Sequence, residues 1–232
     1  FAYSIGSLRV SDDRKKAMVR VFVVSGVLVL LCESAVLANP VSSLQLSAGV
    51  WRSAAGLGTS TREYPLTVLG QKRYENFRLD QDPSLQCEPP GMPRGFSPRS
   101  PMDFNFSGNT LTVRYETMDV VRIVHMNGAS PPPNKPRTPN GHAIGGWNGE
   151  TLVVETTHLT AGEVNRNGIP KSEAMTLYET FDLQKRDDDT YLIINLTITD
   201  PENFTEPHTS TEVFVLEPNW ELFPFECHPT EY

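Results

Sequence analysis

The sequence has 232 residues and carries 28 acidic against 20 basic side chains, so its formal net charge is −8. This length suits one ordinary globular core, and a hydrophobic content of 38% is too high for a disordered chain. Basic residues cluster only in one short N-terminal run, so the chain lacks the positive surface that binding to nucleic-acid phosphates requires. We therefore expect one globular domain and no nucleic-acid partner.

The N-terminal part of the chain has the organisation of a secretory signal peptide. The basic run Arg14–Lys16 precedes an apolar stretch over residues 21–31, and Val36-Leu37-Ala38 gives a small-x-small ending of the signal-peptidase type. Because the apolar stretch is too short to span a bilayer, we expect cleavage and no stable membrane insertion of the mature protein. Met18 is the natural initiator for such a signal.

This interpretation divides the chain into three parts. We expect residues 1–17 to be upstream translated sequence, residues 18–38 the signal peptide, and residues 39–232 one mature domain in the periplasm or outside the cell. Cleavage would remove five basic and three acidic residues, which changes the net charge from −8 to −10.

Cleavage would also remove Cys32 and leave two cysteines, Cys87 and Cys227. An even number of cysteines in an oxidising compartment favours a disulfide between them. In the chain-entropy description, closing a loop of about 140 residues stabilises the fold by several kcal/mol. Two free thiols, or a shared ligand role, are the alternatives.

Alternation of apolar and polar residues dominates the mature chain, and helical periodicity is scarce. A long segment rich in proline, over residues 82–101, is expected to be irregular. The elements predicted in chain order are a strand over 44–52, a helix over 67–77 capped by Thr67, and strands over 109–116, 119–126, 150–157, 174–184, 190–199 and 208–216.

Many short strands joined mainly by short turns, without interleaved helices, predict an all-β fold. The longest predicted strands alternate cleanly, with Leu192, Ile194, Leu196 and Ile198 on one face of the strand over 190–199. An antiparallel β-barrel of the calycin or lipocalin type is favoured because closure protects the strand edges. A β-sandwich is the alternative.

Glu179 interrupts the apolar face of its predicted strand, which it shares with Leu177 and Phe181. A carboxylate on such a face has to be hydrogen-bonded, paired or protonated, and such groups cluster at functional sites. Glu179 is therefore a candidate catalytic base. A structural ion pair, for example with Arg122 or Arg114, is the alternative.

A second unusual stretch joins a loop with five prolines, over residues 128–141, to a glycine-rich strand entrance. The loop cannot join a sheet and should cross the surface in an extended form. Glycines bracket His142 and Trp147, as at the mouth of a binding site. Alternatively, Trp147 fills the core and His142 bonds a loop carbonyl.

Two of these stretches resemble a family of exported bacterial proteins with the motifs CxPPGxPR and GHxxGxWxGxTLVVxT, here CEPPGMPR and GHAIGGWNGETLVVET. That family has no established activity, so the resemblance implies domain boundaries but no function. Arg94, Glu155 and Glu173 fall on its recurrent positions. Lys171 stands where the family generally has histidine, which puts in doubt any role, metal ligation included, that needs an imidazole there.

The signature motifs of several enzyme classes are absent: GxSxG, SxxK, HExxH, the P-loop and the Rossmann glycine fingerprint. No two of the five histidines are three or four residues apart, so we expect neither a metal nor an organic cofactor. The candidates that remain are Glu179, His142 and Glu155 for acid–base catalysis, and Trp147, Arg94, Tyr115, Arg122 and Glu173 for ligand binding.

Three functions fit these residues. The first is binding of a small apolar or aromatic molecule inside the barrel. The second is acid–base catalysis without a metal on such a molecule, by an isomerase, dehydratase or cyclase mechanism. The third is a structural or interaction module of the cell envelope.

Overall fold

The computed structural model describes residues 20–24, 27–31, 41–54, 56–60, 63–96 and 100–229. The chain forms two compact units, residues 1–39 and 40–232. In the first unit, β1 (Arg20–Val24) and β2 (Val27–Leu31) pair as an antiparallel hairpin within the predicted signal peptide. The predicted cleavage point at Ala38 and the predicted upstream segment lie outside the described residues.

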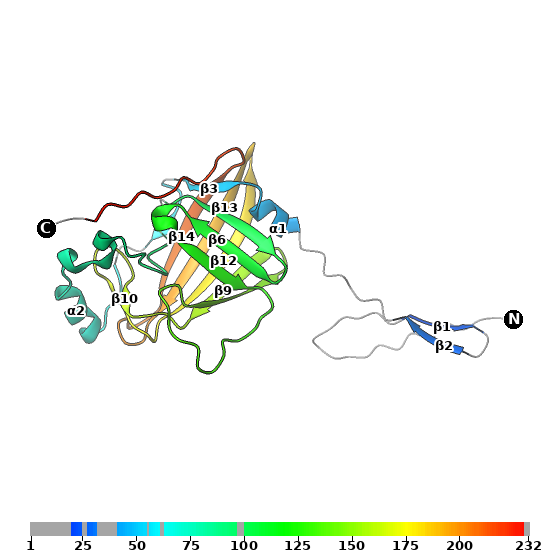
Figure 1. The fold of residues 1–232 in the computed structure, drawn as a ribbon, viewed down its shortest axis with the longest axis horizontal. Helices are drawn as coiled ribbons and strands as arrows, with labels where there is room; N and C mark the ends of the chain where they lie inside the picture. The colour runs from blue at the N-terminus through cyan, green and yellow to red at the C-terminus, as the bar shows by residue number, and fades with distance from the viewer. Residues whose placement is uncertain are drawn as a thin grey trace. The chain divides into compact units, whose positions relative to one another are not determined.

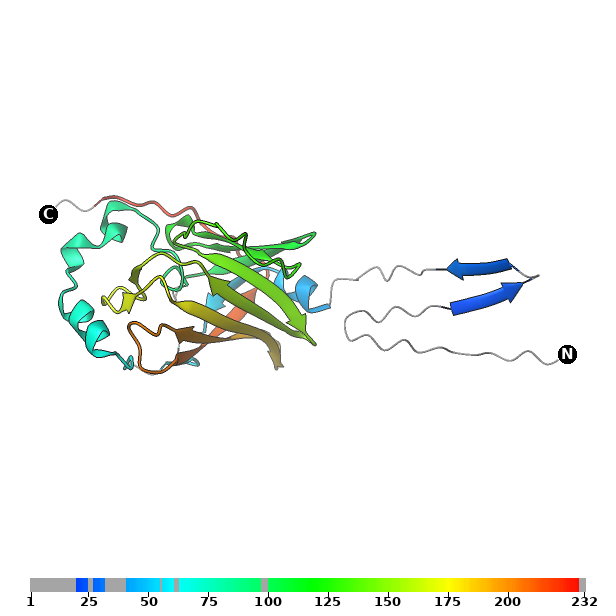
Figure 2. The same ribbon diagram turned by 90° about the horizontal axis from the view of Figure 1, so that it is seen from below.

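Within the described part of the second unit, nine strands close into a barrel. Figures 1 and 2 show this barrel from two directions. This confirms the predicted all-β barrel. Around its circumference the order is β13-β12-β9-β8-β7-β6-β5-β3-β14, and β14 pairs again with β13. The strands are β3 (Val50–Ser53), β5 (Met102–Ser107), β6 (Thr110–Tyr115), β7 (Val121–His125), β8 (His142–Asn148), β9 (Thr151–Thr157), β12 (Thr176–Arg186), β13 (Asp189–Thr199) and β14 (His208–Glu217).

One pair of barrel strands departs from the predicted antiparallel arrangement. β7 and β8 are parallel, with Val124 opposite Ala143, whereas the other neighbouring barrel strands are antiparallel. A parallel pair needs a connection of about a dozen residues or more, and the proline-rich loop between His125 and His142 supplies it. Lipocalin barrels have eight up-and-down strands, so this nine-stranded mixed barrel differs from them in strand number and in this connection.

Shorter elements lie outside the barrel wall. The predicted helix is confirmed as α2, in which the Thr67 side chain accepts a hydrogen bond from the Gly70 backbone N–H. The first predicted strand, 44–52, is partly wrong, because its beginning is helical and the Trp51 indole N–H caps that helix at the Leu46 carbonyl, 2.8 Å away. The elements are α1 (Val41–Leu46), β4 (Thr59–Ser60), α2 (Val68–Glu75), β10 (Gly162–Glu163), β11 (Pro170–Lys171) and single helical turns over Leu79–Gln81, Pro83–Gln86 and Thr117–Asp119.

The core fills the barrel. The predicted inner face of β13 is buried throughout, and its outer face is more exposed. On β12 the inner face comprises Leu177, Glu179 and Phe181, all 3% exposed or less. Phe104 and Phe181 meet edge to face across the interior, with ring centroids 5.9 Å apart. Such burial of apolar surface is the main force that holds a barrel closed.

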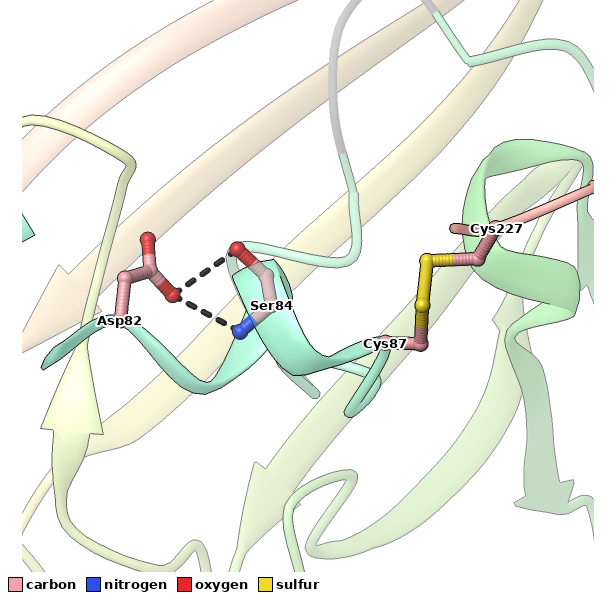
Figure 3. The surroundings of a disulfide bond; sticks show 4 residues. All are labelled: Asp82, Ser84, Cys87 and Cys227. Carbon is pink, nitrogen blue, oxygen red and sulfur yellow. Dashed lines mark hydrogen bonds between the residues drawn. A yellow bond between two sulfur atoms is a disulfide. The ribbon is translucent and has the colours of Figure 1, made fainter. Parts of the chain in front are cut away.

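A covalent link fixes the segment that covers one end of the barrel. Cys87 and Cys227 form the predicted disulfide, shown in Figure 3. It joins the turn over residues 83–86 to the C-terminal segment after β14. That segment also docks through its backbone, since the Phe223 N–H donates to the Glu116 carboxylate. In both ribbon views α2 lies at this end of the barrel and α1 at the other.

Candidate functional site

A buried ion pair occupies the middle of the barrel. Arg122 on β7 donates two hydrogen bonds to the Glu179 carboxylate on β12, one of them 2.8 Å long, and a third to Thr156 Oγ1 on β9 at 2.7 Å. Both charged side chains are 1% exposed. Glu179 thus forms the ion pair that the sequence left open as its structural alternative. Both carboxylate oxygens of Glu179 are therefore engaged by Arg122.

Tyr115 lies beside this pair and completes a polar layer. Its side chain is buried, and its hydroxyl has no hydrogen-bond partner among the described residues. Burial raises the pKa of Tyr115 to about 12. Burial lowers the pKa of Arg122, but the attraction of Glu179 outweighs this effect and raises it above the ordinary value. The predicted ligand-binding residues Tyr115 and Arg122 are therefore part of the core.

His142 and Glu155 do not face Glu179, so the predicted acid–base group is not assembled. Alternation along β8 and β9 places both on the outer side of the barrel wall, whereas Glu179 points inward. His142 stacks on His125 with ring centroids 4.5 Å apart, and its Nε2 lies 3.3 Å from the Ala129 carbonyl. Glu155 is exposed. The sequence analysis named the three residues as candidates without the strand pairing that shows them on opposite sides of the wall.

Two predicted ligand-binding residues also lie apart from this layer. Trp147 is half-buried and stacks on Phe106, with ring centroids 6.0 Å apart. This agrees with the alternative interpretation, in which Trp147 packs in the core. Glu173 is exposed and forms an ion pair with Arg137 at 3.1 Å. Neither residue lines the cavity at the mouth of the barrel.

A cavity of about 530 Å³ lies at the mouth of the barrel, where β13 ends and β14 begins. This volume falls within the range of small-molecule sites, about 300–1,000 Å³. Strands of the wall, the covering segment over residues 79–96 and the loop over residues 164–166 enclose it. Its apolar lining consists of Leu79, Leu85, Pro90, Pro93, Phe96, Met118, Val164, Leu196 and Ile198, and its polar lining includes Tyr64, Asp82, Ser84, Arg94, Asn165, Arg166, His208, Ser210 and Glu212.

The inner face of β14 supplies three polar groups to this cavity. His208, Ser210 and Glu212 lie directly opposite buried apolar residues of β13, and opposite residues of an antiparallel pair share a face. The Tyr64 ring stacks on the His208 ring at a centroid distance of 3.9 Å. One wall of the cavity therefore combines aromatic rings with a carboxylate.

These groups are partly withdrawn from water. Burial raises the pKa of Glu212 and lowers the pKa of His208. The pKa of Tyr64 is also raised, first by burial and then by the nearby Glu212. Burial is the largest cause of all three shifts, because it disfavours the charged form of each group.

Arg94 is the one predicted ligand-binding residue that lines the cavity, and its charge is already matched. It donates to both carboxylate oxygens of Asp82, at 2.9 and 2.5 Å, and to Ser84 Oγ at 3.0 Å. Figure 3 shows Asp82 accepting from Ser84 at the start of the turn that leads to the disulfide. Burial would raise the pKa of Asp82, but the bonds from Arg94 and Ser84 lower it.

Sequence reasoning missed Tyr64, His208 and Glu212. The strand over 208–216 was predicted, and its alternation places Glu212 on the same face as Phe214. The argument that singled out Glu179 applies less strongly to Glu212, because the same face also carries His208 and Ser210. Tyr64 has no such signal, because only the tertiary fold brings its loop against β14.

Comparison with known protein families and with characterised proteins gives no match. Among the described residues, no three His, Cys, Asp or Glu side chains are grouped so that they could hold a metal ion. In the same part of the chain, no helix is long and apolar enough to cross a membrane.

Proposed function

We propose that this protein is an exported β-barrel that binds a small apolar or aromatic molecule in the cavity at the barrel mouth. The cavity itself carries the proposal. It is large enough for a small organic ligand, and apolar side chains line it together with polar groups from β14, the covering segment and the loop over residues 164–166. This combination is typical of ligand sites, in which apolar surface provides affinity and a few polar groups orient the ligand.

The position of the site differs from the one that the sequence favoured. A ligand in the middle of the barrel would have to displace the Arg122–Glu179 pair, which is dry and fully bonded at both carboxylate oxygens. At the mouth, by contrast, Leu196 and Ile198 of the inner wall already line the cavity. A ligand there gains contact with the barrel interior without breaking any interaction of the core.

Export is the second part of the proposal. The Cys87–Cys227 disulfide is of the kind that persists in oxidising compartments. It agrees with the signal-peptide pattern of residues 18–38 and with action outside the cytoplasm.

The cavity is tested with N-phenyl-1-naphthylamine, a neutral apolar probe whose fluorescence rises when it leaves water. We expect saturable binding to the wild type and a Kd at least tenfold weaker in Ser210→Phe. Ser210 lines the cavity and faces inward, so a phenyl ring there would occupy the space that the probe needs.

Thr209→Phe is the matched control, because Thr209 directly precedes Ser210 on the same strand and is exposed. It adds the same ring to the outer face and should leave the Kd unchanged. Circular dichroism and thermal unfolding establish that both variants are folded. Absence of saturable binding to the wild type, or equal binding to the two folded variants, would overturn the proposal.

A further inference from the structure

We infer that the cavity selects an organic ammonium ion with an aromatic or apolar body, and that Glu212 is the counter-ion that holds it. This inference rests on the proposed function and names its ligand class. It starts from a carboxylate that the fold places on the inner side of the wall and that has no hydrogen-bond or ion-pair partner among the described residues.

Glu212 makes no hydrogen bond or ion pair with any described residue, although it is only partly exposed. Its position is fixed by the β14 ladder, in which it lies opposite Ile194. Ile194 is fully buried, so the carboxylate stands at the border between the packed core and the cavity. A charge in such a place loses hydration and gains nothing from the protein in exchange.

The other charged or ionisable groups of the cavity do not compensate Glu212. Arg94 is committed to Asp82 through two hydrogen bonds. Arg166 also contributes to the lining, but its side chain is exposed and therefore hydrated. Burial lowers the pKa of His208, which keeps the imidazole neutral near pH 7. Among the described residues that line the cavity, none therefore compensates the negative charge of Glu212.

An ammonium group is the ligand feature that best matches this charge. Burial raises the pKa of Glu212, which means that the ionised form is penalised in the empty cavity. A cation within hydrogen-bond distance would stabilise the ionised form and replace the lost hydration with charge-assisted hydrogen bonds. An anionic ligand would meet repulsion at the same position.

The aromatic walls favour the same class of ligand. The faces of aromatic rings attract cations, with about 0.5–2 kcal/mol per contact depending on hydration. Tyr64 and Phe96 both line the cavity, and the Tyr64 ring stacks against His208 on the wall that carries Glu212. Phe96 packs on Tyr115 and Phe214, which fixes its ring. The apolar lining then accommodates the body of the ligand.

The experiment uses three compounds that share one ring system and differ in the terminal group: 2-(1-naphthyl)ethylamine, 2-(1-naphthyl)ethanol and 1-naphthylacetate. Each competes with N-phenyl-1-naphthylamine for the wild-type protein at pH 7.5. We expect the amine to bind at least tenfold more tightly than the alcohol, and the carboxylate to bind most weakly. The order reports on charge because the apolar contacts are the same for all three.

Glu212→Gln should abolish the preference for the amine and leave the affinity for the alcohol within about twofold of the wild type. Glu155→Gln is the matched control, because Glu155 is an exposed carboxylate on the outer face of the wall. It changes the net charge of the protein by the same amount and should retain the full preference.

The outcomes separate this inference from the proposed function. If the neutral probe binds but the amine and the alcohol bind equally, or if none of the three compounds displaces it, the ammonium ligand class is wrong and the binding cavity remains. A preference for the amine that survives in Glu212→Gln also overturns the inference. Absence of probe binding to the wild type overturns the proposed function itself.

Discussion

Two carboxylates on the inner face of the barrel wall lie in different surroundings, although the same strand separates them. Glu179 lies opposite Leu196 of β13 on one side, and Glu212 lies opposite Ile194 on the other. Glu179 is fully buried and bound by Arg122 through two hydrogen bonds. Glu212 borders the cavity, and no described residue pairs with it.

The surroundings of an inward-facing carboxylate determine its role, which is structural for Glu179 in the core and different for Glu212 at the cavity. Glu179 on β12 forms a buried ion pair with Arg122 on β7, and this pair links two strands across the barrel interior. A buried pair of this kind is costly to break from one side only, because the remaining charge is left without compensation. Glu212 has no such partner among the described residues, and we propose that a ligand supplies one.

The largest expected effect comes from breaking the paired carboxylate. Glu179→Gln leaves the Arg122 guanidinium buried with a neutral partner, and we expect the free energy of unfolding to fall by about 3–5 kcal/mol. Urea denaturation monitored by circular dichroism measures it.

The double variant Glu179→Leu, Arg122→Met is the control, since it removes both charges and replaces them with apolar side chains of similar size. Replacement of a whole buried pair is often neutral or stabilising, so most of the lost stability should return. A loss below about 1 kcal/mol in Glu179→Gln would contradict a dry, structural role for the pair.

The second largest effect concerns the covering segment over residues 79–96. Replacing Cys87 and Cys227 together by serine should lower the free energy of unfolding by about 2–4 kcal/mol. The disulfide ties the turn that carries Ser84 and Leu85, both cavity-lining residues, to the C-terminal segment. Hydrogen exchange should therefore rise in residues 79–96 and 218–229.

The same measurement contrasts the two carboxylate sites, because the strands around Glu179 should keep their protection. Wild-type protein treated with a reductant should reproduce the exchange pattern of the double serine variant. Unchanged exchange in residues 79–96 would show that the cover is held without the disulfide.

Much of the barrel wall was predictable, because local alternation shows which residues of a strand share a face, but β5 and β8 were not among the predicted strands. β12 and β13 carry long, regular alternation, and the inner faces follow from it directly. The parallel pairing of β7 with β8 was not predictable, since strand order depends on where a loop returns and not on the strands themselves.

The candidate site was harder to predict for a physical reason. Glu179 is conspicuous because its neighbours on the inner face are apolar, whereas the inner face of β14 begins with His208 and Ser210 and so resembles a solvated face. Near an open mouth, polar side chains can point inward without being sealed from water. Alternation identifies the two faces there but does not tell which one is inside.

The smallest expected effect is the change in stability caused by Glu212→Gln, and its sign differs from that expected for Glu179→Gln. Because burial raises the pKa of Glu212, folding favours its protonated form. The contribution of this group to stability is present below its unfolded pKa and is lost as the pH rises through its raised folded pKa. At pH 7.5 the ionised Glu212 therefore destabilises the empty protein slightly.

Glu212→Gln removes that penalty, so the variant should unfold at the same or a slightly higher temperature than the wild type at pH 7.5. The difference should shrink at pH 4, where the wild-type carboxyl group takes up its proton. Thermal unfolding at the two pH values measures it. A lower unfolding temperature for Glu212→Gln at pH 7.5 would mean that Glu212, like Glu179, stabilises the fold. A rise would mean that the barrel keeps this carboxylate at a cost in stability, which a cationic ligand would offset on binding.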